Sequence, residues 1–485
     1  MSTGLAAPEA RPAAPEKARL RDPLQRIRGR KRTAIASAAL VGVLAVAAAL
    51  RFIGIDHGLP FGLLNPDEQV IVPRAWDMVH GGGPNPHWFN YPSVVLYLMA
   101  PFQAWHAAPA YLDARILMAL LGVGAVAATW WLGLRAYGLV AAAIGSAVVA
   151  VDVTHVAYSH MAVTDIPLTL GVAASLALMV SGRIELAGVV AGLAMGAKWP
   201  GVLLIVPLIV AAWRQWRRLG IAVLLGAITF IATSPFVLVE PRKAFHDAWT
   251  TQDVHHTGWL GFEHDGTALI GFLHRLWSGM GPLLVIAFVG LVAALVARRR
   301  PDLILASFVL IYFINLLTLK SHFDRFVLPL IPALGVLAGR VRILAPVTAA
   351  LLIVPLIWSI QRDEQLTKAD TRVVAHDWIQ SHIPSGTTIA AESSTAPLTG
   401  FDVLPLELPG PAFPTDPNRE VRRLERQGVR YVLVNGLVAD RVLAASSSYP
   451  QESRFYHDLA SEAQRVYYVR PGGDLSGPWL ALYRI

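Results

Sequence analysis

The sequence of 485 residues contains no cysteine, so disulfide bonds and thiolate chemistry are excluded and the redox compartment is left open. Charged residues are also scarce. They make up 15% of the chain, whereas soluble domains carry about 25%. Hydrophobic residues reach 54%. This balance excludes an ordinary soluble globule and predicts a polytopic membrane protein.

Acidic residues are fewer than basic ones, and the formal net charge is +8. A basic chain can bind nucleic acid, but the sequence lacks the interleaved basic and aromatic pattern of such proteins. Membrane proteins instead concentrate their basic excess in cytoplasmic loops. We therefore predict a lipid bilayer as the partner of this chain, and no nucleic acid.

Apolar runs suited to crossing about 30 Å of hydrocarbon as helices recur along the chain. They lie at residues 33–53, 112–134, 138–154, 166–181, 185–198, 201–213, 219–238, 277–297, 302–319, 324–339 and 343–360. We therefore expect an α-helical polytopic domain over residues 33–360 with about eleven crossings.

Arginine positions predict the orientation of these crossings. Residues 1–32 are rich in Ala, Pro and Arg, which predicts a disordered basic cytoplasmic tail. With that tail inside, every inner turn carries arginine, as the positive-inside rule requires. These arginines are Arg135, Arg183, Arg214, Arg217, Arg218, Arg298, Arg299, Arg300, Arg340 and Arg342. The expected location is the cell membrane, with the N-terminus cytoplasmic and the C-terminus outside.

The first outer loop, residues 54–111, contains its own helical patterns. YPSVVLYLMAPFQAW, residues 91–105, is apolar with aromatic ends, which is typical of an interfacial helix or a re-entrant segment. A true crossing here would move every later arginine cluster to the outer side. Charge bias therefore favours an interfacial helix.

The chain changes character after residue 360 and becomes mixed and polar. The pattern predicts a helix that ends before Pro384, a strand at TTIAA, and a helix at VRRLERQG that stops at Gly428. A buried strand YVLVN, a helix SRFYHDLASEAQRV and a strand WLALYRI follow. Residues 361–485 are therefore expected to form a small α/β domain outside the cell.

Four stretches together resemble the GT-C superfamily of integral-membrane glycosyltransferases. They are NPDEQVIVPRAW (65–76), YSHMAVTDIPLTLGVAASL (158–176), GLAMGAKWPGVLLIVPLIVA (192–211) and LKSHFDRFVLPLIPALGVLAG (319–339). The similarity is to the branch that uses polyprenyl-phosphate sugars, which includes protein O-mannosyltransferases and the lipid A aminoarabinose transferase. The resemblance implies a GT-C fold and a sugar donor carried on polyprenyl phosphate.

The resemblance also implies that Asp67 is the catalytic carboxylate. Glycosyl transfer needs an acceptor hydroxyl made nucleophilic and a place for the departing phosphate. Asp67 would accept the acceptor proton, directly or while holding a cation, and Glu68 would orient Asp67 or share that cation. Asp165 opens a crossing and is either a second active-site acid or an ordinary helix N-cap before Pro167.

Cationic side chains at the same membrane boundary are candidates for binding the departing phosphate, which needs fixed positive charge. These candidates are Lys198, Lys320, His322, Arg325, Arg74 and Arg115. Lys198 could instead snorkel to the interface. For Arg325 the alternatives are a local pair with Asp324 or contact with a lipid headgroup.

Residues 254–266, VHHTGWLGFEHDG, are rich in His, Gly and aromatic residues. His256 and Trp259 suit contact with a sugar or acceptor, because flat rings pack on pyranose faces. An interfacial aromatic belt explains the same residues. Tyr91 is a further candidate for such a contact. Some relatives carry a lysine before a Pro-Pro pair where this chain has FNYPS (89–93), so no phosphate contact is transferred to this position.

The predicted function is inverting transfer of a hexose, with mannose first by resemblance, from a polyprenyl-phosphate carrier to an outer hydroxyl. The acceptor could be a glycan, a lipid or a protein. A divalent ion (Mg, Mn or Zn) is left open, with Asp67, Asp165 and His160 as its ligands; for His160 the alternative is structural hydrogen bonding. A transporter or channel, and a non-catalytic scaffold for the outer domain, are the other classes that stay open.

Overall fold

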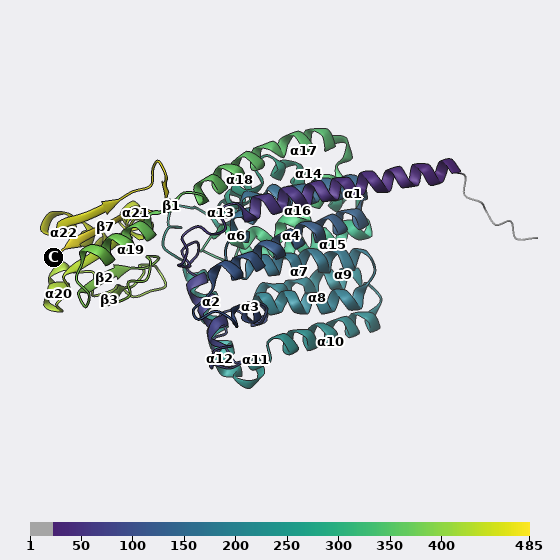
Figure 1. Cartoon of the computed structure of the whole chain (residues 1–485). Coiled ribbons are helices and arrows are strands. Elements are labelled where there is room, and N and C mark those ends of the chain that lie inside the picture. The colour runs from purple at the N-terminus through teal and green to yellow at the C-terminus, as the bar shows by residue number, and fades with distance from the viewer. Residues whose placement is uncertain (1–22) are drawn as a thin grey trace, which may run out of the picture.

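The computed structural model describes residues 23–485, with side chains from residue 33 onward. It contains a helical domain and, at one end of it, a smaller C-terminal domain (Figure 1). We call the end next to the C-terminal domain the site end and the opposite end the far end. A disordered tail was predicted for residues 1–32. Residues 1–22 of it lie outside the described residues, and residues 23–32 belong to a helix that begins at Pro23.

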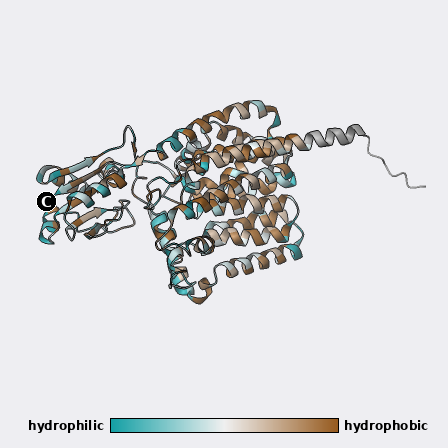
Figure 2. Cartoon of the chain, viewed as in Figure 1, coloured by the Kyte–Doolittle hydropathy of each residue, from teal (hydrophilic) through white to brown (hydrophobic). Residues whose placement is uncertain are grey.

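Each predicted apolar segment falls on a helix or on consecutive helices. These are α1 (Pro23–Phe52), α4 (Tyr111–Ala136), α5 (Leu139–Val151) with α6 (Val153–Ser159), α7 (Asp165–Val180), α8 (Ile184–Ala197), η1 (Trp199–Leu204) with α9 (Ile205–Ala211), α10 (Trp216–Thr233), α14 (Leu283–Ala297), α15 (Arg300–Leu316), η2 (Asp324–Leu330) with α16 (Ile331–Arg340), and η3 (Arg342–Leu344) with α17 (Ala345–Leu351) and α18 (Ile353–Leu366). Hydrophobic residues cover most of this domain (Figure 2).

Fewer of these helices are long enough to cross a bilayer alone. Within the described residues, four segments have the length and apolar composition to cross, and two bent helix pairs would raise the number to six. By contrast, α7 and α8 have 16 and 14 residues. Their lengths of about 24 and 21 Å fall short of about 30 Å of hydrocarbon. The protein is a helical membrane protein, and the count of about eleven crossings stays a prediction.

One predicted crossing begins in the wrong place. The segment 277–297 was expected to be continuous, but its first residues belong to α13 (Ala268–Met280), which meets α14 at a bend of 114°. The bend falls at Gly281, whose φ of +57° suits glycine, and Pro282 follows it. The apolar helix therefore starts at Leu283.

The first outer loop forms two short helices at the site end, α2 (Glu68–Asp77) and α3 (Val94–Gln103). α3 has 10 residues and occupies the segment predicted as an interfacial helix. Its buried side chains share a small core with α2 and α4. Two more helices, α11 (Phe236–Val239) and α12 (Pro241–Thr257), follow α10 at this end (Figure 1).

The C-terminal domain is built around a five-stranded sheet with the order β3-β2-β4-β7-β5. The strands are β2 (Thr388–Glu392), β3 (Asp402–Leu406), β4 (Tyr431–Asn435), β5 (Gln464–Val469) and β7 (Leu480–Arg484). β2 is parallel to β3 and β4, whereas β7 is antiparallel to β4 and β5. The helices are α19 (Thr371–His382), α20 (Val421–Arg426), α21 (Gly436–Ala444) and α22 (Pro450–Glu462).

The predicted elements of this domain are all found, with one difference in boundary. The last helix was expected to include QRV, but α22 ends at Glu462 and these residues begin β5. Among the strands of the sheet, β3 and β5 were not predicted, and neither was the helix α21. β3 lies at the sheet edge and is mostly exposed, so it lacks the apolar signal of a buried strand.

A buried polar junction connects the two domains. His57 contacts the carbonyl oxygens of Leu366 and Lys368 through Nδ1 and lies 3.0 Å from Asp370 through Nε2. Arg372 donates to Asp370 and, across the junction, to the Leu63 carbonyl at 2.7 Å. A short parallel pair, β1 (Ala369–Asp370) with β6 (Leu475–Ser476), lies beside it. The junction fixes the C-terminal domain next to the loop that carries Asp67.

Candidate active site

Asp67 lies in the turn that leads into α2. Its backbone N–H donates to Asn65 Oδ1 at 2.9 Å. Its Oδ2 accepts hydrogen bonds from Arg325 Nη1 at 2.5 Å and from the Tyr91 hydroxyl at 3.0 Å. Within the described residues Oδ1 accepts none, and the side chain is 24% exposed. One oxygen is therefore fixed and the other is open to a ligand.

A second ion pair joins Asp165 to Lys198. Lys198 Nζ donates to Asp165 Oδ1 at 2.6 Å, and it lies over the rings of Tyr91 and Phe326 at 5.3 and 5.2 Å. The N-cap of α7 is Thr164, and Asp165 is its first helical residue. The N-cap alternative for Asp165 is therefore wrong, because its carboxylate binds Lys198 instead of the helix end.

The two pairs form one group, which we call the acid–base cluster: Asp67, Asp165, Lys198 and Arg325. Lys198 interacts electrostatically with the other three. The formal charges of these four side chains sum to zero, but some N–H donors of the two cations make no hydrogen bond within the described residues. Arg325 Nε is buried without a hydrogen-bond partner in the described part of the chain, and Lys198 uses one of its three N–H groups.

The alternative of a local ion pair between Arg325 and Asp324 is wrong. The Asp324 carboxylate accepts hydrogen bonds from the Tyr158 hydroxyl at 2.6 Å and from the Arg325 backbone N–H. The Arg325 guanidinium is thereby left to reach Asp67, 258 positions away in the sequence. It also lies over the rings of Phe323 and Phe326.

The surrounding charges control the protonation of Asp67. Burial alone raises the pKa of its carboxyl, but the charges of Arg325 and Lys198 and the hydrogen bonds from Arg325 and Tyr91 outweigh burial and hold this pKa below its usual value. Asp67 is therefore ionised at neutral pH. A carboxylate with a lowered pKa is a weak base, so its strength depends on where the Arg325 guanidinium lies.

Tyr91 and His255 complete the polar surroundings of the cluster. Burial and the charge of Asp67 raise the pKa of Tyr91, so its hydroxyl stays a donor. Burial and the charges of Arg325 and Lys198 lower the pKa of His255 to about 3. His255 is therefore neutral, and its ring packs edge-on against Phe326 at 5.0 Å.

Glu68 lies in a different environment from its neighbour. Its two oxygens accept from Arg115 Nε and Nη2, both at 2.9 Å, and Oε1 also accepts from the Ala162 N–H. Arg115 Nη1 donates to the carbonyls of Ile55 and His57. Neither charged side chain is exposed. The predictions that Glu68 assists Asp67 and that Arg115 binds phosphate are therefore corrected, because each is fully engaged by the other and by the backbone.

The set predicted to bind a metal does not fit a divalent ion. His160 is buried, with its ring nitrogens 3.0 Å from the carbonyl oxygens of Val156 and Ile53. Asp67 and Asp165 already hold cationic side chains. The described residues contain no group of three His, Asp or Glu placed to hold an ion. His160 thus has the structural hydrogen-bonding role that was its alternative.

Two of the phosphate candidates in the SHFDR turn lie outside the acid–base cluster. Lys320 is exposed, and its backbone N–H donates to the His255 carbonyl. His322 is buried, with Nδ1 at 3.3 Å from Asp265, which also binds Arg275 at 2.6 Å. His322 therefore joins this turn to α13. Of the three candidates in the turn, the cluster includes only Arg325.

Arg74 is the remaining candidate. Its guanidinium donates to the Val70 carbonyl and lies 4.9 Å from the centre of the Trp88 ring. Trp88 in turn packs edge-on against Tyr91. Within the described residues Arg74 makes no ion pair, so it stays a candidate for phosphate at the rim of the cluster.

The segment that follows α12 connects the cluster to the C-terminal domain. His256 is exposed and binds the Thr318 carbonyl, so its neighbour His255, and not His256, packs against the cluster. Trp259 packs edge-on against Phe323 and against Phe413 of the C-terminal domain. The structure therefore places His256 away from the cluster, and the sugar contact of Trp259 stays a prediction.

Further contacts anchor this segment. Leu260 is buried in the core of the C-terminal domain, and the Tyr449 hydroxyl donates to Glu263 at 2.5 Å. Gly261 packs against Arg441 of α21, where an added Cβ would lie 3.0 Å from Arg441 Cδ. Arg441 interacts electrostatically with Glu263 and Tyr158. The C-terminal domain therefore places a cation next to the residues around the cluster.

Sequence reasoning missed His255, Tyr158 and Arg441. For His255 a signal was present. Ala244, Asp247, Thr251 and His255 follow helical spacing along α12, and these positions are buried or half-buried. Arg441 carried no signal, because its place depends on the packing of α21 against a distant loop.

Residues 88–321 match the profile of Glycosyltransferase family 87. No curated protein sequence matches the chain. Among solved structures, ArnT from Cupriavidus metallidurans in the apo state has 18% identity and a TM-score of 0.60, over 93% of this chain and 98% of that chain.

Two further structures carry ligands or ions. ArnT from the same organism bound to undecaprenyl phosphate has 17% identity and a TM-score of 0.58, over 91% of this chain and 97% of that one. The Archaeoglobus fulgidus oligosaccharyltransferase in complex with Zn and sulfate has 13% identity and a TM-score of 0.52, over 90% of this chain and 73% of that one. At these identities the likeness shows the fold. Together with the family match, it confirms the prediction of a membrane glycosyltransferase with the GT-C fold.

Proposed function

We propose that this glycosyltransferase moves a hexose, with mannose as the first candidate, from a polyprenyl phosphate to an acceptor hydroxyl, with inversion at the anomeric carbon. One observation carries the proposal: Asp67 presents an open oxygen beside two cations that have unused donors. Two proteins of similar fold were solved with undecaprenyl phosphate and with dolichol-phosphate, which supports a polyprenyl-phosphate donor.

The open Oδ1 of Asp67 is the base in this proposal. It takes the proton of the acceptor hydroxyl while that oxygen bonds to the anomeric carbon. The bond from this carbon to the phosphate oxygen breaks, and its electron pair leaves with the phosphate. The phosphate departs as an anion and needs positive charge rather than a proton. Arg325 Nε and the unused N–H groups of Lys198 supply that charge.

Donor binding also adjusts the base. In the free protein Arg325 binds Asp67 and lowers its pKa. A phosphate that draws the guanidinium away removes the main charge that weakens Asp67, so the carboxylate becomes a better base when the donor is present. Because the residues present do not fit a divalent ion, no step of this mechanism is assigned to one.

The cluster faces the outer side of the membrane in this proposal. Its support is the arginine bias: the turns at the far end contain the arginine groups, and the cluster lies at the site end. A reporter fused after Arg218 or Arg300 is expected to be cytoplasmic. A reporter after Gly261 or at the C-terminus is expected to be outside, and a cytoplasmic C-terminus would contradict the orientation.

Transfer from labelled donors tests the function directly. Purified protein in detergent is incubated with radiolabelled polyprenyl-phosphate sugars and with glycan, lipid and protein fractions as acceptors. We expect label to move from a polyprenyl-phosphate sugar to one class of acceptor. Asp67→Asn should stop the transfer, and Asp56→Asn, which changes an exposed acid of the same loop, should not. No transfer from any such donor would contradict the proposal.

A further inference from the structure

A basic pocket lies at the far end of the helical domain, away from the acid–base cluster. It has a volume of about 510 Å³ and is lined by Ala136, Tyr137, Arg299, Arg340 and Arg342. The pocket lies at the end of α4, which has 26 residues and so extends about 39 Å. Glu68 contacts Arg115 near the start of the same helix. This pocket is therefore separate from the proposed transfer site.

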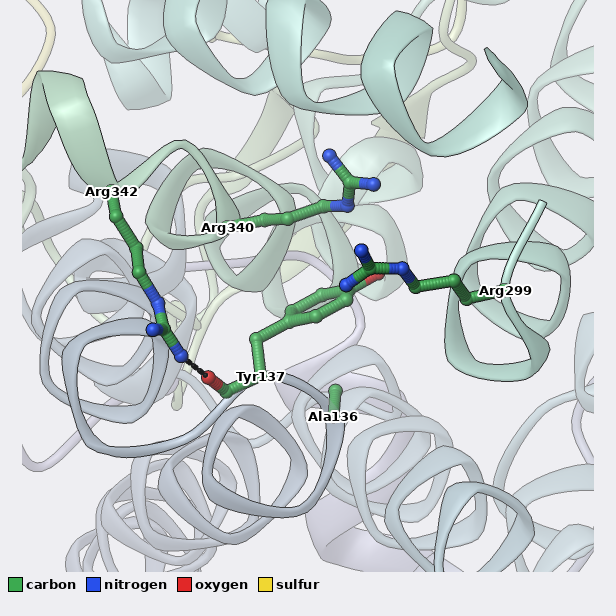
Figure 3. A pocket seen from close by; sticks show the side chains of 5 residues that line it. All are labelled: Ala136, Tyr137, Arg299, Arg340 and Arg342. Atoms are coloured by element: carbon green, nitrogen blue, oxygen red, sulfur yellow. Dashed lines mark hydrogen bonds between the residues drawn. The ribbon is translucent and has the colours of Figure 1, made fainter. Parts of the chain in front are cut away.

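Two turns bring the arginines to Tyr137, which follows α4. Arg299 precedes α15, Arg340 ends α16, and Arg342 begins η3; their side chains converge on the tyrosine (Figure 3). Arg342 Nη2 donates to the Tyr137 carbonyl at 2.6 Å. Arg340 lies 5.6 Å from the centre of the Tyr137 ring. The Arg299 side chain thus lies beside two guanidinium groups that come from a turn about 40 positions further along the chain (Figure 3).

A single buried carboxylate organises this group. Asp302 Oδ1 accepts from the Tyr137 hydroxyl at 2.7 Å and from Arg340 Nε at 2.8 Å. Its Oδ2 accepts from Arg340 Nη2 and from the Arg299 backbone N–H. Asp302 is unexposed. Both of its oxygens are therefore occupied, and it neutralises one of the three guanidinium groups.

The remaining charge of the pocket is about +2, on exposed Arg299 and Arg342. Arginine binds phosphate oxygens through a planar fork of N–H donors, and a prearranged set binds with less loss of side-chain freedom. Orientation bias explains why arginines are common at this end. It does not explain why Asp302 binds the Arg340 guanidinium and the Arg299 backbone, and why the Tyr137 carbonyl binds Arg342, around one cavity.

The apolar surroundings indicate the chemistry of the ligand. Ile343, next to Arg342, is 88% exposed, and Val296 near the end of α14 is 78% exposed. In a helical membrane protein such side chains face acyl chains, so a ligand at this pocket meets apolar surface next to the arginines. Basic pockets between membrane helices commonly bind phospholipid headgroups. We infer that this pocket binds the phosphate of an anionic phospholipid from the bilayer.

Lipid binding to the full-length protein in neutral detergent tests this inference. Phosphatidylglycerol is compared with phosphatidylcholine for wild type and for the double variant Arg299→Gln with Arg342→Gln. We expect wild type to prefer phosphatidylglycerol and the double variant to lose that preference. The expected loss is about fivefold for each arginine and about 25-fold for both. Asp302 and Arg340 are unchanged, so the buried contacts that organise the turns are kept.

A matched double variant controls for general surface charge. Arg214→Gln with Arg217→Gln removes two exposed arginines, one from the turn between α9 and α10 and one from the start of α10, and neither lines the pocket. It should keep the preference for phosphatidylglycerol. Equal losses in the two double variants, or an unchanged affinity in the pocket variant, would overturn the inference. Equal displacement of the lipid by glycerol phosphate at the same concentration would also overturn it, because the ligand would then be a soluble phosphate.

Discussion

Asp67 and Glu68 are adjacent in the sequence, and each pairs with an arginine, yet the two ion pairs differ in every respect that matters for chemistry. The Glu68–Arg115 pair is unexposed, and both of its carboxylate oxygens are occupied. The Asp67–Arg325 pair is partly exposed, and among the described residues Asp67 Oδ1 and Arg325 Nε have no hydrogen-bond partner.

This difference separates a structural ion pair from a reactive one. A buried pair with complete hydrogen bonding has no capacity left for a substrate, and removing one partner leaves an uncompensated charge inside the protein. A pair with unused donors and acceptors can exchange its internal contacts for contacts with a ligand. Substitutions at Asp67, at Glu68 and at the cations separate a reactive carboxylate from a structural one.

The largest effect is expected for Asp67→Asn. The amide cannot accept the acceptor proton, so turnover should fall about 10²- to 10⁴-fold. Thermal unfolding should be nearly unchanged, because the side chain is partly exposed and its hydrogen bonds can be kept. Transfer per folded molecule is the measurement. Near-normal turnover would move the base to Asp165.

Glu68→Gln should show the opposite pattern. The change leaves the Arg115 charge buried without a counter-ion, which costs about 3 to 5 kcal/mol of stability. Thermal unfolding in detergent measures the loss, with exposed Asp56→Asn as the control at about 0.5 kcal/mol or less. The folded fraction should still transfer sugar. An unchanged unfolding temperature together with lost turnover would place Glu68 in the chemistry.

Changes to the two cations should reduce use of the donor. A charge-assisted hydrogen bond contributes about 1.5 to 3 kcal/mol, so Arg325→Ala and Lys198→Ala should each lower donor-limited efficiency about 10- to 150-fold. Arg325→Lys should recover part of the loss, since an ammonium keeps the charge but not the planar fork. Full recovery by lysine would show that the fork does not contact phosphate. Steady-state kinetics with varied donor provide the comparison.

The smallest effect is a shift in pH dependence. Asp67 must be ionised to act as a base, and its lowered pKa keeps it ionised in moderate acid. The acid limb of kcat/KM should therefore lie below about pH 4. Lys198→Met removes one of the charges that lower this pKa, so the limb should move to higher pH. A limb that stays in place or moves to lower pH would contradict the assignment.

Much of the fold could be predicted because it depends on local pattern. Apolar runs marked the long helices of the membrane domain but not α2, α12 or most of α13, and β-branched runs marked β2 and β4. The bend at Gly281 was signalled by a glycine and a proline inside an apolar run. The edge strand β3 could not be found this way, because an exposed edge lacks a buried face.

The sequence could predict which residues form the site better than it could predict which of them pair with one another. Asp67, Asp165, Lys198 and Arg325 were all candidates, and the structure brings them together. The sequence could not show that Glu68 binds Arg115, 47 positions away, because that pairing depends on how α2 packs against α4. It also could not show that Asp324 is engaged by Tyr158, which frees Arg325 to reach Asp67.

Binding of a polyprenyl phosphate to the variants tests the central claim, that the acid serves the chemistry and the cations bind the carrier. Wild type, Asp67→Asn, Lys198→Ala and Arg325→Ala are compared by equilibrium binding in detergent. Asp67→Asn should bind the lipid as well as wild type or more tightly, because a negative charge near the phosphate is gone and a neutral amide holds Arg325 less strongly than a carboxylate does. Lys198→Ala and Arg325→Ala should bind it about 10- to 150-fold more weakly. Loss of the lipid by Asp67→Asn, with binding kept by the two cation variants, would contradict the account.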